Sequence, residues 1–129
     1  MILVDTSAWI AFFRDQSPVA DMVDRALEGD DAALCGPVVT ELRRGFTSRV
    51  ERTRYVPLIE ACHQLAQPTR LWDEAGDLGF ALARKGVTVK SLDLLIAAYA
   101  LAHRVPVLTL DRDFSLMARA GIGLQLAQK

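Results

Sequence analysis

The sequence predicts an α/β fold, a three-layer α/β/α sandwich whose central sheet is mostly parallel. Short, wholly apolar runs recur along the 129 residues, and longer amphipathic stretches separate them. Strands that alternate with helices are typical of parallel sheets, because a crossover helix returns the chain to the same end of the sheet. The length fits one domain, so we expect residues 1–129 to fold around a single core.

The apolar runs place the strands. Met1–Val4 is wholly apolar, which is typical of a strand buried on both faces. A second short strand is expected at Ala32–Cys35, a core strand at Val105–Leu110 and an edge strand at Leu124–Ala127. Ligands of such sheets bind outside the carboxyl ends of the strands. The residues that follow these runs are therefore the first candidates for chemistry.

The stretches between the strands predict helices. A helix capped by Thr6 or Ser7 would follow the first strand. Pro18 begins the next helix, which ends near Gly29, and Pro37 begins a third. The other helices are expected at 49–64 (with an interruption near Pro57), 70–85, 91–103 and 114–120.

Composition excludes several classes of protein. The longest uninterrupted apolar run, Leu94–Ala102, has nine residues, whereas a membrane-spanning helix needs about 20. The N-terminus has neither the basic region nor the long apolar stretch of a secretory signal. We therefore expect a cytoplasmic protein without a membrane segment. Cys35 and Cys62 lack metal-binding spacing and are expected to be buried free thiols.

Two of the predicted strands are followed by an acidic residue. Asp5 follows the first strand, and Asp111 follows the strand at 105–110. Taken singly, Asp5 could simply cap a helix and Asp111 could form an Asx turn. Taken together, they point to the same edge of the sheet, which favours a shared site.

Two further acidic residues have unusual positions. Glu41 lies about one turn into the third helix, where its simplest role is an i,i+3 ion pair with Arg44. Asp93 lies in the first turn of the most apolar helix, where the helix dipole favours a negative charge. Its spacing to the apolar residues of that helix points it inward, and a buried charge needs a partner.

Convergence of Asp5, Glu41, Asp93 and Asp111 would bring like charges together. Two carboxylates about 5 Å apart repel by roughly 3 kcal/mol at an effective dielectric constant near 20. Either some of them are protonated, or a cation binds among them. Oxygen ligands without His or Cys favour Mg²⁺ or Mn²⁺ over zinc. Magnesium held by a few carboxylates suits the hydrolysis of phosphodiester bonds.

Four segments resemble those of PIN-domain ribonucleases, and the chain has the size of the VapC toxins of bacterial VapBC toxin–antitoxin pairs. The segments are ILVDTSAWI, PVVTELRRGF, SLDLLIAAYAL and VPVLTLDRDF. They occur in the family's order and with roughly its spacing, and the similarity covers essentially all of residues 1–129. The resemblance implies a single PIN domain with the PIN-like three-layer fold.

The resemblance also implies the roles of individual residues. Asp5 and Asp93 match direct Mg²⁺ ligands of the family. Glu41 and Asp111 would complete the acidic site through water or a second ion, and Asp113 is an alternative to Asp111. The hydroxyls of Thr6 and Thr109 match supporting groups. The resemblance further implies cleavage of RNA, commonly structured RNA such as tRNA, inhibition by a VapB-like antitoxin, and a homodimer.

Five arginines between residues 43 and 54 form a local basic stripe in a chain whose net charge is -1. The simplest explanation is a solvated helix face with ion pairs to residues such as Glu41. The stripe begins two residues beyond that acid, so it could instead bind RNA phosphates or an acidic segment of an antitoxin. The candidates for this contact are Arg43, Arg44, Arg49 and Arg52.

Other functions fit the sequence less well. A phosphoacceptor receiver domain needs an acidic pair after the first strand, but Thr6 and Ser7 follow Asp5. A dehalogenase-type phosphatase needs a second Asp at position 7, and no G-x-G-x-x-G or P-loop motif is present. A PIN-like module that binds RNA or protein without cutting it remains the main alternative, which the four acidic residues disfavour.

Overall fold

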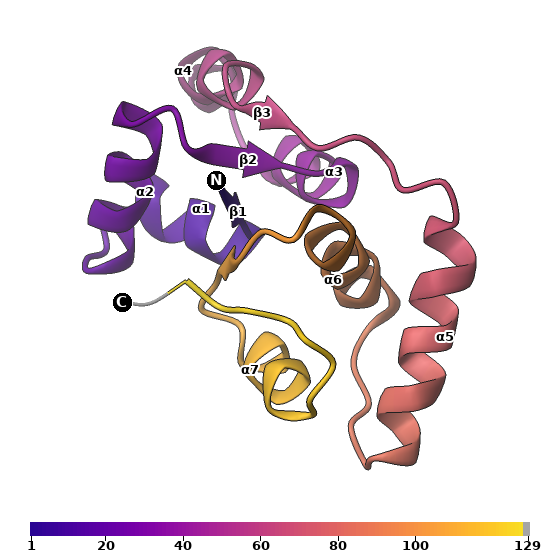
Figure 1. Cartoon of the computed structure of the whole chain (residues 1–129). Helices are drawn as coiled ribbons and strands as arrows, with labels where there is room; N and C mark the ends of the chain where they lie inside the picture. The colour runs from indigo at the N-terminus through magenta and orange to yellow at the C-terminus, as the bar shows by residue number, and fades with distance from the viewer. Residues whose placement is uncertain (128–129) are drawn as a thin grey trace.

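The computed structural model describes residues 1–127 and has a four-stranded sheet at its centre (Figure 1). All strand pairs are parallel, and Leu3 pairs with both Ala33 and Val107. The predicted parallel α/β/α architecture is therefore confirmed. The strand order is β3-β2-β1-β4, with β1 at Ile2–Val4, β2 at Ala32–Leu34, β3 at His63–Gln64 and β4 at Val107–Leu108.

Within the described residues, six helices lie between the strands and a seventh follows β4. Successive steps from β1 to β3 run in one direction across the sheet, and the step from β3 to β4 runs back. Right-handed crossovers place the helices of that return step on the opposite face, and Figure 1 shows α2 and α5 on opposite sides of the molecule. The helices are α1 (Thr6–Phe13), α2 (Val19–Glu28), α3 (Gly36–Gly45), α4 (Arg49–Glu60), α5 (Leu71–Arg84), α6 (Ser91–His103) and α7 (Arg112–Arg119).

The core is built around β1 and α6. Leu3 and Val4 are fully buried, as expected for a central strand with helices on both faces. In α6, every side chain from Ile96 to Ala100 is buried, because this helix is apolar around most of its circumference. The core therefore fixes α6, and with it Asp93, relative to the central strand.

The segment expected as an interrupted helix at 49–64 differs from the prediction. Helix α4 continues through Pro57 to Glu60, and His63–Gln64 form the edge strand β3. Pro57 cannot donate to the carbonyl of Thr53, but both residues are exposed, so water can replace that hydrogen bond. A two-residue strand is too short to show an alternating pattern, which is why the sequence did not reveal β3.

The two C-terminal strand predictions were too long. Only Val107–Leu108 of the expected strand at 105–110 pairs with β1. The expected edge strand at 124–127 is a single parallel bridge between Val107 and Leu126. The early end of β4 leaves residues 109–111 outside the ladder, where Thr109 binds Asp5 and Leu110 binds Ser7.

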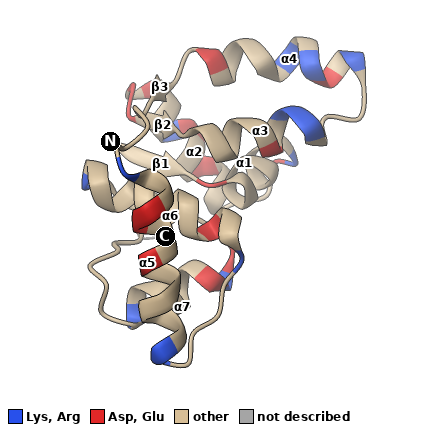
Figure 2. Ribbon diagram, turned by 90° about the vertical axis from the view of Figure 1, so that its right-hand side faces the viewer, with Lys and Arg blue, Asp and Glu red and all other residues tan. Residues whose placement is uncertain are grey.

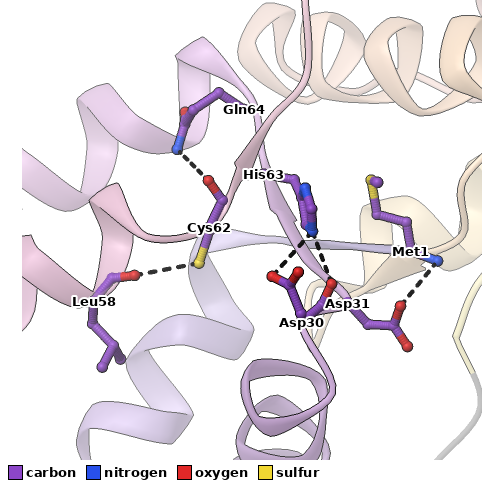
Figure 3. A network of polar contacts seen from close by, with 7 residues as sticks. All are labelled: Met1, Asp30, Asp31, Leu58, Cys62, His63 and Gln64. Carbon is purple, nitrogen blue, oxygen red and sulfur yellow. Dashed lines mark hydrogen bonds and ion pairs between the residues drawn. The ribbon is translucent and has the colours of Figure 1, made fainter.

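Polar contacts connect the amino ends of the strands, at the sheet edge opposite Asp5 and Asp111 (Figure 3). The amino group of Met1 lies 3.7 Å from the carboxylate of Asp31. The ring of His63 lies 2.8 Å from the carbonyl oxygen of Asp30 and 3.2 Å from its carboxylate. These contacts tie the starts of β1 and β3 to the loop before β2.

The cysteines and the helix lengths were both subjects of predictions from composition. Cys35 and Cys62 are buried free thiols, as predicted. Among residues 1–127, no helix is long and apolar enough to cross a membrane.

The two glycines within α5 offer a test of the packing between α5 and α6. A Cβ at Gly79 would lie 2.7 Å from Cδ1 of Leu94, whereas a Cβ at Gly76 would meet nothing within 4 Å. We expect Gly76→Ala to raise the free energy of unfolding by about 0.5–1 kcal/mol, because alanine favours the helix. Gly79→Ala should be less stable than Gly76→Ala by about 1 kcal/mol, because Leu94 must move. Urea unfolding measures both, and equal gains would contradict this close packing.

Candidate metal centre

The fold brings the predicted acidic residues to the carboxyl edge of the sheet from four different elements. Asp5 follows β1, Asp111 follows β4, Asp93 lies in the first turn of α6, and Glu41 lies on α3. Asp5 and Asp93 are only 4% and 6% exposed. Figure 2 shows red segments on α3, α6 and α7 around this edge. The inward orientation predicted for Asp93 is confirmed.

Asp5 is held by hydroxyl groups on one of its two oxygens. Ser7 Oγ and Thr109 Oγ1 each donate to Oδ2 at 2.9 Å, and the Ser7 backbone N–H donates to the same oxygen at 3.4 Å. The bond from the Ser7 N–H makes Asp5 the cap of α1, so the expectation that Thr6 or Ser7 caps this helix was wrong. Because every hydrogen bond to the Asp5 side chain among the described residues reaches Oδ2, Oδ1 is left for a ligand.

Ser7 is a residue of the site that the sequence did not single out. Its Oγ accepts from the backbone N–H of Leu110 at 2.8 Å while donating to Asp5. Thr109 likewise accepts from the N–H of Asp111 at 2.9 Å while donating to Asp5. The two hydroxyls thus lock the loop after β4 to the acid after β1. The i,i+2 spacing from Asp5 at a helix start was the available signal for Ser7.

Asp93, Asp111 and Asp113 form a cluster whose ligand oxygens lie within 4.8 Å of one another. Asp111 also caps α7, accepting from the N–H of Asp113 at 2.9 Å. The sequence left open whether Asp111 or Asp113 faces the site, and the structure brings both to it. At an effective dielectric constant near 20, each pair at this separation repels by roughly 3 kcal/mol.

The environment of Asp93 disfavours its ionised form. Burial is the main cause, and repulsion from Asp111, with smaller contributions from Asp5 and Asp113, adds to it. Lys90 opposes these effects but does not cancel them, and the pKa of Asp93 rises from 3.8 to about 6. Asp93 Oδ2 is buried and, within residues 1–127, has no hydrogen-bond partner.

Within residues 1–127, the close group of carboxylates contains neither Asp5 nor Glu41, and Glu41 contacts α1 instead. The hydroxyl of Thr6 donates to its Oε1 at 2.7 Å, and the supporting role that the resemblance implies for Thr6 stays a prediction. Asp5 and Glu41 both help burial to raise the pKa of the Cys35 thiol to about 12. Cys35 therefore stays protonated behind the site and does not offer a thiolate ligand.

The residues present fit a hard divalent cation. Within residues 1–127, Asp93 has a buried oxygen that accepts no hydrogen bond and Asp5 has an oxygen that accepts none. The atoms of the carboxylate cluster that could bind a metal ion are all oxygens. Mg²⁺ and Mn²⁺ prefer such ligands. A cation here would also remove the repulsion within the cluster. Direct ligation by Asp5 and Asp93, with Glu41 and Asp111 or Asp113 acting through water or a second ion, stays a prediction.

The basic stripe lies on α3 and α4, at the end of the molecule where Figure 2 shows blue segments. Arg43 pairs with Glu60 at 3.1 Å and links the two helices. Arg44, Arg49 and Arg52 are exposed and form no ion pair within residues 1–127. The expected pair between Glu41 and Arg43 or Arg44 was therefore wrong, because Thr6 binds Glu41 instead. Four arginines of the stripe, with Arg54 as the fourth, have no ion-pair partner within residues 1–127.

Comparison with known proteins now identifies the fold and the family. The profile of the PIN domain matches residues 2–120, so the chain belongs to the PIN-domain family, as the four motifs predicted. Over 124 residues it is 33% identical to VapC ribonuclease Mb1587 of Mycobacterium bovis and to Ribonuclease VapC11 of Mycobacterium tuberculosis, covering 92% of each chain.

Solved structures agree with this assignment. VapBC2 from Rickettsia felis, bound to a DNA fragment from its promoter, matches with a TM-score of 0.77 and 20% identity over 98% of each chain. VapBC-5 from Mycobacterium tuberculosis matches with a TM-score of 0.67 and 26% identity, covering 98% of this chain and 97% of the other.

The raised pKa of Asp93 predicts how stability depends on pH without metal. The folded protein keeps Asp93 protonated up to about pH 6, whereas the unfolded carboxyl ionises above about pH 4. Rising pH therefore lowers stability between these values. We expect Asp93→Asn to raise the free energy of unfolding by about 1–3 kcal/mol at pH 7.5, and the gain should shrink as the pH falls to 4.

Urea unfolding in EDTA at several pH values measures this effect. Asp24→Asn, at an exposed position of α2, is the matched control and should change stability little. Millimolar Mg²⁺ or Mn²⁺ should raise the melting temperature of the wild type and not that of Asp93→Asn. A wild-type melting temperature that ignores both metals would argue against a cation site.

Proposed function

We propose that the chain is a VapC-type ribonuclease, the toxin of a toxin–antitoxin pair, which uses Mg²⁺ to hydrolyse phosphodiester bonds in RNA. The observation that carries this proposal is the buried, unpartnered oxygen of Asp93 within a cluster of carboxylates. The 33% identity to proteins named as VapC ribonucleases supports it.

Different residues of the chain would bind the ion, position its ligands and orient water. Asp5 and Asp93 would hold the ion, and Ser7 and Thr109 would keep Asp5 Oδ2 in place so that Oδ1 faces the ion. A bound divalent ion supplies Lewis-acid chemistry: it polarises the phosphoryl oxygen and lowers the pKa of a water. Glu41 and Asp111 or Asp113 would orient water at the site. Their carboxylates would also accept a proton from it.

The substrate and partners follow from the resemblance. Structured RNA such as tRNA is the proposed substrate, and a VapB-like antitoxin is the proposed inhibitor; the names of the structural neighbours, which are VapBC complexes, support the latter. Action on cellular RNA implies a cytoplasmic location. The homodimer stays a prediction. A module that only binds RNA or protein is disfavoured. Such binding does not require a buried Asp93 oxygen that, within residues 1–127, accepts no hydrogen bond.

Metal-dependent cleavage tests the proposal. The purified protein should degrade total RNA with Mg²⁺ and not with EDTA, and Asp5→Asn should lower the rate at least about 100-fold, because the ion loses a ligand. Asp21→Asn, at an exposed position of α2, is the control and should cut like the wild type. Equal cleavage by Asp5→Asn would mean that the activity does not come from this site.

The free arginines predict the salt dependence of RNA binding. The double variant Arg49→Glu and Arg52→Glu should weaken binding about tenfold or more. It should also lower the slope of log affinity against log salt by about 0.7 for each RNA phosphate that the variant no longer neutralises. Fluorescence anisotropy with labelled RNA in EDTA measures both quantities.

Arg119→Glu, on the exposed side of α7, controls for net charge and should have little effect. If the double variant binds RNA normally but loses affinity for an antitoxin, the stripe belongs to the protein partner.

A further inference from the structure

A pocket lies directly beside Glu41, between α1, α3 and α4. Its volume is about 310 Å³. Thr6 and Glu41, which hydrogen-bond to each other at the edge of the acidic site, form part of its lining. The pocket therefore adjoins the candidate metal centre, and a molecule whose phosphate is bound there could extend into it.

Aromatic side chains form one wall of this pocket. The rings of Phe13 and Tyr55 stack with centroids 4.0 Å apart, and Phe46 and Tyr55 stack at 6.2 Å with 22° between their planes. All three are half-buried rather than closed in the core. Phe13 and Phe46 are tilted by 50° to each other, so the three rings form a half-buried cluster that lines the pocket rather than a flat stack. Aromatic side chains beside a pocket are a common contact for the bases of single-stranded RNA.

The lining also includes the apolar residues Ile10, Leu42 and Val50, and its polar residues suit a nucleotide. Arg14 and Arg54 line the pocket, and both are exposed, so they can meet the phosphates on either side of a bound base. Glu41 and Glu51 each already accept a hydrogen bond from a threonine, and a carboxylate has further lone pairs for the amino group of a base. The free arginines of α3 and α4 extend the positive charge beyond the pocket.

We propose that this pocket binds one unstacked base of the RNA next to the bond that is cut. The inference rests on the proposed ribonuclease function and adds a specificity site to it. A volume near 310 Å³ is at the lower end for ligand pockets, which fits a single nucleoside. A protein helix would instead need a row of anchoring positions along a groove. The adjoining acids and the arginines together favour RNA as the occupant.

Binding of short RNA in EDTA tests the pocket without cleavage. The probes are single-stranded hexamers with 2-aminopurine at one position at a time, because the fluorescence of this base falls when it stacks. We expect one position to be quenched by the wild type. Tyr55→Leu and Phe46→Leu should remove that quenching and weaken affinity about tenfold, whereas Tyr55→Phe, which keeps the ring, should stay within about twofold.

Controls separate this inference from a general loss of function. Trp72→Leu changes an exposed aromatic residue of α5 outside the pocket and should have no effect, and circular dichroism melting shows whether each variant folds. On total RNA with Mg²⁺, Tyr55→Leu should still cut but with an altered base preference beside the cleaved bond.

Three outcomes would overturn the inference in distinguishable ways. If the wild type cuts RNA but no 2-aminopurine position is quenched, the pocket holds no base and the ribonuclease function stands. If the variants lose affinity only for a protein partner, the pocket belongs to that partner. If the wild type neither binds nor cuts RNA, the proposed function fails first, and the pocket proposal fails with it.

Discussion

Repulsion between carboxylates is the constraint on which the site depends. The parallel sheet directs the residues after β1 and β4 to one edge, and the apolar helix α6 brings Asp93 there while burying it. Burial and the neighbouring acids both disfavour the charge of Asp93, yet no donor among the described residues satisfies its Oδ2. A group kept at such a cost is understandable where a cation completes it.

The surroundings of Asp5 show how the fold supports this arrangement. Two hydroxyl groups, from Ser7 and Thr109, each use their single proton on the same Asp5 oxygen and use a lone pair to accept a backbone N–H of the loop after β4. The carboxylate is thereby oriented without being neutralised. The thiol of Cys35 lies near the negative charges of Asp5 and Glu41, and its raised pKa keeps it from adding another.

Two neighbouring regions of the molecule carry opposite charges. The net charge of -1 conceals an acidic centre at the strand ends and a group of arginines on α3 and α4 (Figure 2). The aromatic pocket is lined by residues of α1, α3 and α4, among them Glu41 and Arg54. A polyanion bound along the arginines would pass the pocket before it reaches the acids. Under the proposed function, the arginines would attract RNA while the like charges stay concentrated at the reactive edge.

Local pattern alone determined much of this protein. The apolar run before Asp5 predicted β1, the 3.6-residue period predicted that Asp93 faces inward, and the four motifs predicted the family. Tertiary structure decided the rest. Thr109 hydrogen-bonds to Asp5, which is 104 positions away in the chain. Glu41 accepts a hydrogen bond from Thr6 and does not form the expected ion pair with Arg44. The strand β3 forms because two residues pair with β2. Periodicity along the chain reports which way a side chain points, but hydrogen bonds and pockets depend on which distant segments the fold places opposite it.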